Sequence, residues 1–189
     1  MEDLKPRSGR FHAVRFYENE GELCRIVADF LGGGLAVGQP AIVVATPKHR
    51  DGIARRFDEI GLDIGELQRS GDLVLRDARE MLAFFMVDGM PDSRRFNTAM
   101  SRLIQQACRG RDDRPVSVYG EMVDVLWKDG NQEGAMRLEL LWNQLAASHD
   151  FSLLCGYAVG SFYKGASRDE ICSQHSHVLS DAGIATAVN

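Results

Sequence analysis

The side chains best suited to bind a ligand follow the short apolar segments that the sequence predicts as β-strands. In an open α/β sheet, ligands bind in the crevice beyond the carboxyl ends of the strands. Such sites combine an apolar body with a few orienting polar groups. The sequence therefore predicts a small-molecule site at this edge, with His49, Asp77 and Gly156 nearby and with these ligand-binding candidates: Tyr17, Thr46, Lys48, Tyr119, Glu121 and Tyr157.

Glu121 and the three tyrosines are the most informative of these residues. Glu121 follows VSVYG and is predicted in the first turn of the next helix, where the helix dipole favours an ionised carboxylate. It could orient a ligand or hold a metal, and stabilisation of the helix end alone explains it equally well. Each tyrosine offers a ring to bury and a hydroxyl to direct, although packing in the core or at its rim explains each of them too.

Three further ligand-binding candidates stand away from the strand ends. His12 lies inside the first predicted strand, where an internally satisfied histidine is the simplest interpretation and a sensing or ligand role is the alternative. Glu139 and Asn143 are one helical step apart on the penultimate helix and could converge on one polar spot. Taken alone, however, the pair is explained more simply as a solvated helix edge.

The cysteine pattern gives little support to a metal or redox site. The four cysteines are scattered without a CxxC pair, so buried free thiols are expected. Cys172 and His175 share a helix face and are weak metal-ligand candidates, but two ligands do not make a closed zinc site. The sequence predicts no bound metal and no cofactor.

Several catalytic and phosphate-binding motifs are missing. After AIVVAT the chain continues PKHRDGI, with Lys48 but without the GK[ST] of a phosphate loop, and the glycine-rich GGGLAVGQ precedes the strand. No GxSxG, HExxH or GxGxxG occurs. We therefore expect no ATP hydrolysis and a protein that is not an enzyme.

The elements that must position these residues alternate along the chain. Asn19, Asp77 and Asn131 are predicted helix N-caps, and Gly32–Gly34 is predicted to end the first helix. Strand–helix alternation with apolar central strands predicts a three-layer α/β domain, with a mostly parallel sheet covered by helices on both faces. The predicted strands are 11–17, 41–46, 73–77, 115–120 and 151–159, and the last three predicted helices are 121–128, 133–147 and 169–181.

Composition sets the class of the protein. Its 189 residues, 44% hydrophobic, suit one globular domain, predicted over 11–181 between a polar leader (1–10) and a C-terminal tail (182–189). The net charge of −5 and the lack of basic patches with interleaved aromatics argue against direct nucleic-acid binding. With no apolar run long enough to cross a bilayer and a polar start, we expect a cytoplasmic protein without membrane contact.

Several stretches together resemble one family. They are HAVRFYENEGELCRIVADFLGGGLAVGQPAIVVAT, VYGEMVDVLWKDGN with LELLWNQL, FSLLCGYAV, and ICSQHSHVL. These resemble the MEDS domain, a methanogen/methylotroph, DcmR-type sensory domain. The positions that match its motifs are His12, Tyr17, Gly120, Glu121, Trp127, Asn131, Glu139, Trp142, Asn143, Cys155, Tyr157, Cys172 and His175.

The resemblance implies a divergent RecA/KaiC-like fold with a degenerate P-loop and a role in bacterial or archaeal signalling. It also implies recognition of small molecules such as simple hydrocarbon derivatives. The leading hypothesis is thus a non-catalytic sensory module whose ligand shifts an equilibrium read by a partner. The expected partner is a histidine kinase, a transcription regulator or an anti-sigma component, and a homodimer surface could also carry the signal, since the chain leaves no room for a fused output domain.

Two alternatives remain open. One is a vestigial nucleotide-binding domain that keeps Thr46, Lys48 and Glu121 as former phosphate and magnesium contacts. The other is a pure protein-interaction module in a kinase or anti-sigma pathway.

Overall fold

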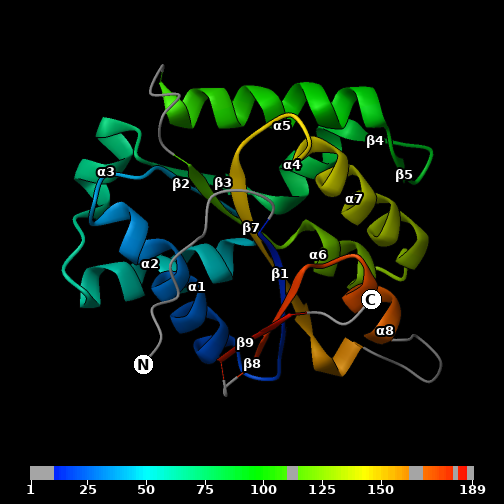
Figure 1. Cartoon of the computed structure of the whole chain (residues 1–189), viewed down its shortest axis with the longest axis horizontal. Coiled ribbons are helices and arrows are strands. Elements are labelled where there is room, and N and C mark those ends of the chain that lie inside the picture. Colours follow the sequence, from blue (N-terminus) through cyan, green and yellow to red (C-terminus); the bar gives the residue numbers. More distant parts are fainter. Residues whose placement is uncertain (1–10, 110–114, 162–167, 181–182, 187–189) are drawn as a thin grey trace.

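A seven-stranded sheet organises the chain (Figure 1). The computed structural model describes residues 11–109, 115–161, 168–180 and 183–186. The strand order is β3-β2-β6-β7-β1-β8-β9, in which the first six strands are parallel and β9 is antiparallel to β8. The strands are β1 His12–Tyr17, β2 Ala41–Ala45, β3 Leu73–Asp77, β6 Val116–Gly120, β7 Phe151–Ala158, β8 His177–Ser180 and β9 Gly183–Thr186.

Helices cover both faces of this sheet, which confirms the predicted three-layer α/β fold. On one face lie α1 Glu20–Leu35, α2 Pro47–Glu59 and α3 Ile64–Ser70 (Figure 1). On the other lie α4 Ala78–Phe85, α5 Ser93–Cys108, α6 Met122–Lys128, α7 Gln132–Leu145 and the short α8 Arg168–Ser173, with the hairpin β4 Met86–Val87 and β5 Met90–Pro91 beside them. A 3₁₀ turn, Val159–Ser161, follows β7.

The central strands are buried on both faces, and their side chains alternate between two cores. Every residue of β2 and β6 is buried. In β6, Val118 enters the core under α4–α7, whereas its neighbour Tyr119 enters the core under α1 and α2. Because successive side chains on a strand point to opposite faces, two candidate residues can be in contact only if they face the same side of the sheet.

The predicted helix starts are confirmed by their caps. The Asn19 side chain accepts from the Gly21 and Glu22 amides, and Asp77 accepts from the Arg79 and Glu80 amides. Asn131 accepts from the Gly134 amide in the same way. In each case a local side-chain oxygen takes up an amide that the first helical turn leaves without a partner.

The predicted end of the first helix was too early. α1 continues through the three glycines to Leu35. A Cβ on Gly32 would stand 2.9 Å from Ile60 Cδ1, and one on Gly34 would stand 3.0 Å from Gln39 Oε1. Close packing against Ile60 after α2 and against Gln39 after α1 therefore outweighs the poor helix propensity of glycine.

The predicted terminal helix over 169–181 is wrong beyond its first turns. α8 ends at Ser173, and His177–Ser180 form β8, which pairs in parallel with β1 through Ala13↔His177. An unpaired edge of β1 would expose its backbone groups, and β8 covers it. β9 lies within the segment predicted as a C-terminal tail, and α3 and the β4–β5 hairpin were not anticipated.

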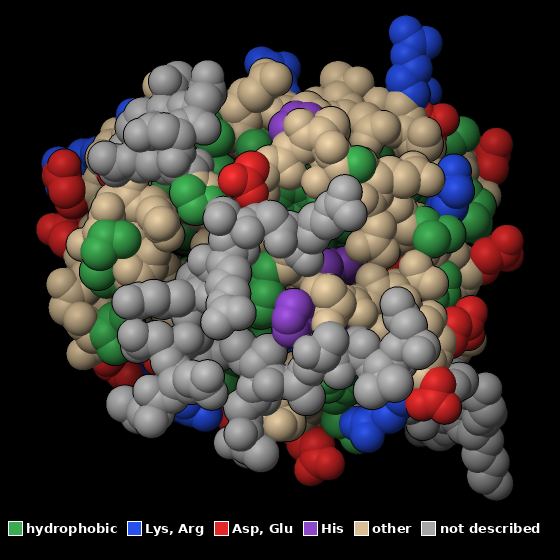
Figure 2. Space-filling model, in the orientation of Figure 1, with side chains coloured by type: hydrophobic (Ala, Val, Ile, Leu, Met, Phe, Trp, Pro, Cys, Tyr) green, Lys and Arg blue, Asp and Glu red, His purple; other side chains and the backbone are tan. Residues whose placement is uncertain are grey.

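On the face shown in Figure 2, charged side chains of both signs are dispersed, mostly around the rim. Within the described ranges, none of the helices has the length and apolarity that a bilayer span requires.

Candidate functional site

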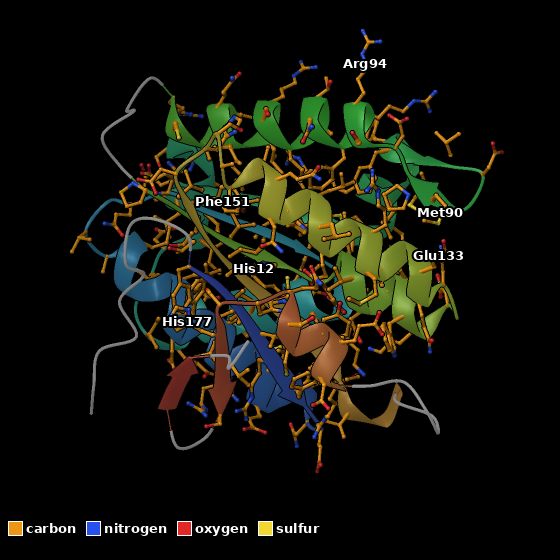
Figure 3. The ribbon with its side chains drawn as sticks, turned by 45° about the vertical axis from the view of Figure 1, so that its right-hand side comes forward. His12, Met90, Arg94, Glu133, Phe151 and His177 are labelled. Carbon is orange, nitrogen blue, oxygen red and sulfur yellow. The ribbon has the colours of Figure 1, made fainter. Side chains whose placement is uncertain are left out.

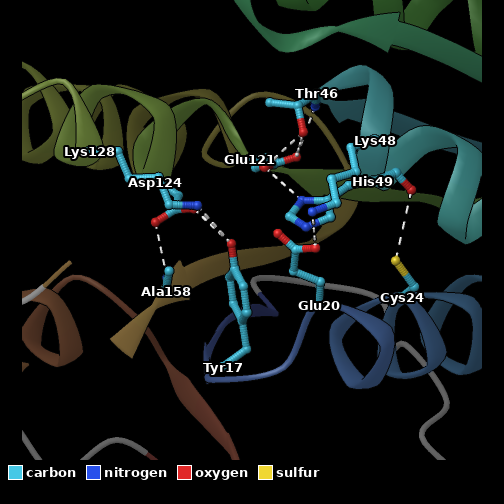
Figure 4. Close-up of polar contacts among 10 residues, drawn as sticks. All are labelled: Tyr17, Glu20, Cys24, Thr46, Lys48, His49, Glu121, Asp124, Lys128 and Ala158. Carbon is cyan, nitrogen blue, oxygen red and sulfur yellow. Dashed lines mark hydrogen bonds and ion pairs between the residues drawn. The ribbon is translucent and has the colours of Figure 1, made fainter. Parts of the chain in front are cut away.

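Glu121 ties together two of the strand ends. It is the N-cap of α6, yet its side chain makes no cap bond and turns toward the neighbouring β2–α2 connection. The carboxylate is buried and accepts from the Thr46 backbone amide at 2.9 Å, from Thr46 Oγ1 at 3.2 Å and from His49 Nδ1 at 2.7 Å (Figure 4). Glu121 therefore joins the carboxyl ends of β2 and β6.

A second buried carboxylate, Asp124, joins the ends of β1 and β7. The Tyr17 hydroxyl donates to Asp124 Oδ2 at 2.9 Å, and the Ala158 amide donates to Oδ1 at 3.0 Å (Figure 4). Lys128 Nζ lies 2.7 Å from Asp124 Oδ2 and donates to the Tyr17 hydroxyl at 3.0 Å. Burial, together with the negative charge of Asp124, raises the pKa of Tyr17 far above its ordinary value. Asp124 is not among the predicted site residues, although a carboxylate among the apolar residues of MVDVLW signals a buried acid that needs partners.

We call Tyr17, Thr46, His49, Glu121, Asp124 and Lys128 the carboxyl-end cluster. Its acids are already satisfied by protein donors, and the Thr46 amide at the start of α2 is taken by Glu121. Lys48 stands outside it, exposed and paired with Glu20 at the surface. Tyr119 lies beneath it in the core, fully buried, and its hydroxyl has no hydrogen-bond partner among the described residues.

Tyr157 does not join this cluster, which corrects the expectation that it shares one crevice with Tyr17 and Glu121. In the β1–β7 register, Tyr17 pairs with Ala158 and Phe16 pairs with Tyr157. Neighbouring side chains on a strand point to opposite faces, so Tyr17 and Tyr157 lie on opposite sides of the sheet. The Tyr157 hydroxyl donates instead to Glu139 Oε1 at 2.7 Å.

Glu139 belongs to a second buried group, which we call the histidine cluster: His12, Glu139, Cys155 and His175. His12 Nε2 lies 3.2 Å from Glu139 Oε2 and 3.4 Å from Cys155 Sγ. His175 Nε2 lies 3.4 Å from Glu139 Oε1, and Cys155 Sγ lies 3.7 Å from Glu139 Oε2. Glu139 is 0% exposed, so the idea of a solvated helix edge is wrong for this residue.

Partners outside the histidine cluster fix both imidazole rings. His12 Nδ1 lies 2.9 Å from Asn143 Oδ1, and Asn143 Nδ2 donates to the Gln174 carbonyl, which sets the amide orientation. His175 Nδ1 donates to the Ile171 carbonyl at 2.7 Å. Each ring therefore carries a proton on Nδ1 and directs Nε2 into the cluster. Glu139 and Asn143 both contact His12, as the less favoured interpretation, convergence on one polar spot, had it.

Burial and mutual charge shift the pKa values of three members of the histidine cluster. Burial and the neighbouring His175 lower the pKa of His12. Burial alone would raise the pKa of Glu139, but the two histidines outweigh it and hold that pKa well below its usual range. Burial and the charge of Glu139 raise the pKa of the Cys155 thiol. The arrangement thus places an ionised carboxylate against the two imidazole rings and a protonated thiol.

Of the two weak metal-ligand candidates, only His175 reaches the histidine cluster. Cys172 is partly exposed and lies outside it. The partners that sequence reasoning did not assign to His175 are His12, Glu139 and Cys155. They come from β1, α7 and β7, so no short spacing connects them.

A pocket of about 350 Å³ opens beside His12, at the amino ends of β1 and β7. It therefore lies at the opposite end of these strands from the predicted crevice. Figure 3 shows Phe151 and His12 near each other at the starts of the two strands. Its lining combines apolar walls with a few polar groups: Phe11, His12, Trp142, Asn143, Ala146, Ala147, Phe151, Leu153 and Ser176.

Comparison with known proteins assigns the family. No curated protein matches the chain. The family model described as "MEthanogen/methylotroph, DcmR Sensory domain" (MEDS) matches residues 11–176, which include β1 through α8 and all four members of the histidine cluster. The chain therefore belongs to the MEDS family of sensory domains.

Proposed function

We propose that the chain binds a small, mainly apolar organic molecule in the pocket beside His12 and relays its presence to a signalling partner. Membership of a sensory-domain family supports the signalling role. The observation that carries the ligand proposal is the pocket of about 350 Å³, which is near the lower end of the range of small-molecule sites. We propose binding without turnover, so the compound is recovered unchanged.

The pocket wall suggests the kind of molecule. Trp142 and Phe151 provide aromatic surface, while His12, Asn143 and Ser176 are the polar groups that could orient one functional group. A simple hydrocarbon derivative, with a short apolar body and one polar or halogen substituent, fits this composition and volume. A charged metabolite would find no buried counter-ion in this lining.

The position of the pocket suggests how binding could be relayed. Its walls come from β1, β7, the end of α7 and Ser176, just before β8. Ser176 holds this segment to β1, because its amide donates to the His12 carbonyl at 2.8 Å and its hydroxyl does so at 3.0 Å. A ligand that binds better to one arrangement of α7 and this segment would shift the equilibrium between arrangements. A histidine kinase, a transcription regulator or an anti-sigma component would read the change.

One observation weighs against the nucleotide-binding alternative. A phosphate at the start of α2 would need free amides there. The Thr46 amide donates to Glu121, and the negative carboxylate stands where a phosphate would approach. The small-ligand proposal needs no such displacement.

A thermal-shift screen of small organic molecules tests the proposal, with Ala146→Phe as the pocket-filling variant. Ala146 is partly buried and lines the pocket, so a ring there should occupy the volume. Leu140→Ala is the matched control, because Leu140 is on α7, exposed and outside the pocket lining. We expect compounds that raise the Tm of the wild type and of the control but not of Ala146→Phe. Equal stabilisation of all three proteins, or no stabilising compound in the library, would refute the proposal.

A further inference from the structure

We propose that the histidine cluster is a tetrahedral binding site for a divalent transition metal, with Zn²⁺ as its ion. The ligand atoms are His12 Nε2, His175 Nε2, Cys155 Sγ and one oxygen of Glu139. Imidazole, thiolate and carboxylate are the side-chain groups that bind zinc in proteins. A mixed set of two nitrogens, one sulfur and one oxygen suits zinc better than magnesium or calcium, which favour oxygen.

The distances fit a single ion. Zn–N and Zn–O bonds of about 2.0–2.2 Å and a Zn–S bond of about 2.3 Å place tetrahedral ligand atoms about 3.3–3.7 Å apart. Among His12 Nε2, Cys155 Sγ and Glu139 Oε2 the separations are 3.2, 3.4 and 3.7 Å. His175 Nε2 lies 3.4 Å from Glu139 Oε1, and all the ligand atoms lie within 4.8 Å of one another. The side chains therefore need only small adjustments to surround an ion.

The hydrogen bonding within the histidine cluster is incomplete in a way that a bound cation would complete. His175 Nε2 is buried and has no hydrogen-bond partner among the described residues, although it faces Glu139 Oε1. His12 Nε2 likewise faces the carboxylate, 3.2 Å from Oε2. A single thiol proton on Cys155 cannot satisfy both imidazole lone pairs and the carboxylate, whereas one metal ion accepts electron density from all of them.

A second layer of contacts orients the ligands. The Ile171 carbonyl and the Asn143 amide oxygen bind the Nδ1 protons of His175 and His12. The Tyr157 hydroxyl binds Glu139 Oε1 and leaves Oε2 directed at His12 and Cys155. Metal-binding histidines in proteins almost always donate their second ring N–H to such a group.

Charge balance also favours a divalent ion. Coordination would displace the Cys155 proton to solvent, so that Zn²⁺ would meet one thiolate and one carboxylate. The resulting site has no net charge, which a buried position requires. The ion would link β1, β7 and α7 to the segment after α8, beneath the pocket that His12 lines.

Cobalt titration tests this inference without any organic ligand, so its outcome is independent of the pocket proposal. The chain is freed of metal with a chelator, titrated with Co²⁺, and the cobalt is then displaced by Zn²⁺. We expect one equivalent per chain, the visible bands of tetrahedral cobalt, and a thiolate-to-cobalt charge-transfer band in the near ultraviolet. Zn²⁺ should also raise the Tm of the wild type.

Two cysteine variants locate the ligand. Cys155→Ser should lose the charge-transfer band and weaken zinc binding more than about 100-fold, whereas Cys172→Ser should keep both. Asn143→Ala, which removes only the group that orients His12, should weaken binding about 10–100-fold. If Cys155→Ser does not fold, the stoichiometry and spectrum of the wild type still decide. Failure of the wild type to bind one equivalent, or a band that survives in Cys155→Ser or disappears in Cys172→Ser, would overturn the inference.

Discussion

Replacement of Glu121 by alanine gives the sharpest test of the carboxyl-end cluster. The carboxylate is 1% exposed and accepts from the Thr46 amide, the Thr46 hydroxyl and His49 Nδ1 at 2.7–3.2 Å. Hydrogen bonds to a charged group contribute about 1.5–3 kcal/mol each and are not additive. Because removal leaves several donors without an acceptor, we expect Glu121→Ala to lower the free energy of unfolding by about 3–5 kcal/mol.

Urea unfolding followed by tryptophan fluorescence measures this loss, since Trp127 and Trp142 are both buried. For a chain of this size, the expected decrease in Tm is about 6–20 °C. Glu121→Gln should cost less, about 1–3 kcal/mol, because the amide keeps one acceptor oxygen but turns its NH₂ toward a donor. Glu20→Ala is the control, since the Glu20–Lys48 pair is exposed and should contribute less than about 1 kcal/mol. An alanine variant at position 121 as stable as the Glu20 control would refute the account of the cluster.

Three further predictions concern two positions at the same strand ends and one in α1. Tyr17→Phe removes the hydroxyl that contacts Asp124 and Lys128, and it should lower the free energy of unfolding by about 1–2 kcal/mol in urea denaturation; an unchanged midpoint would show that the hydroxyl contributes nothing. Gly156→Ala should cost about 1–3 kcal/mol in the same assay, since its Cβ would stand 2.9 Å from the Tyr119 hydroxyl. Gly33→Ala, whose Cβ meets nothing within 4 Å on an exposed helical position, should instead stabilise the chain by about 0.5–1 kcal/mol, and a loss there would contradict the packing analysis.

Features that depend on neighbouring residues could be predicted from the sequence. A cap needs only a side-chain oxygen and an amide two or three residues later, so Asn19, Asp77 and Asn131 were identified correctly. The strands β2 and β6 followed from continuous apolar segments that suit burial on both faces. Their alternation with helices was enough to predict the three layers.

Features decided by distant parts of the chain could not be predicted in this way. Val178 and Leu179 continue an apparent helical pattern, but they form strand β8 because they pair with the edge of β1. Likewise, Tyr17 and Tyr157 both end apolar segments, yet a one-residue difference in register sends them to opposite faces. In each case the pairing partner lies more than a hundred residues away along the chain.

The histidine cluster shows why spacing alone misses a buried polar site. His12 and Cys155 are on adjacent parallel strands, and the pairing of Val14 with Cys155 places the sulfur within reach of the His12 ring. Glu139 contacts them from α7, on the face of the sheet where Tyr157 also lies. His175 joins them because the segment between α8 and β8 runs beside β1. A fully buried carboxylate on a helix has to be compensated by such partners. The fold thus brings three further ligand groups to Glu139, from positions in the sequence that share no motif. Two imidazole nitrogens that face one buried carboxylate are the reason to look for a cation there.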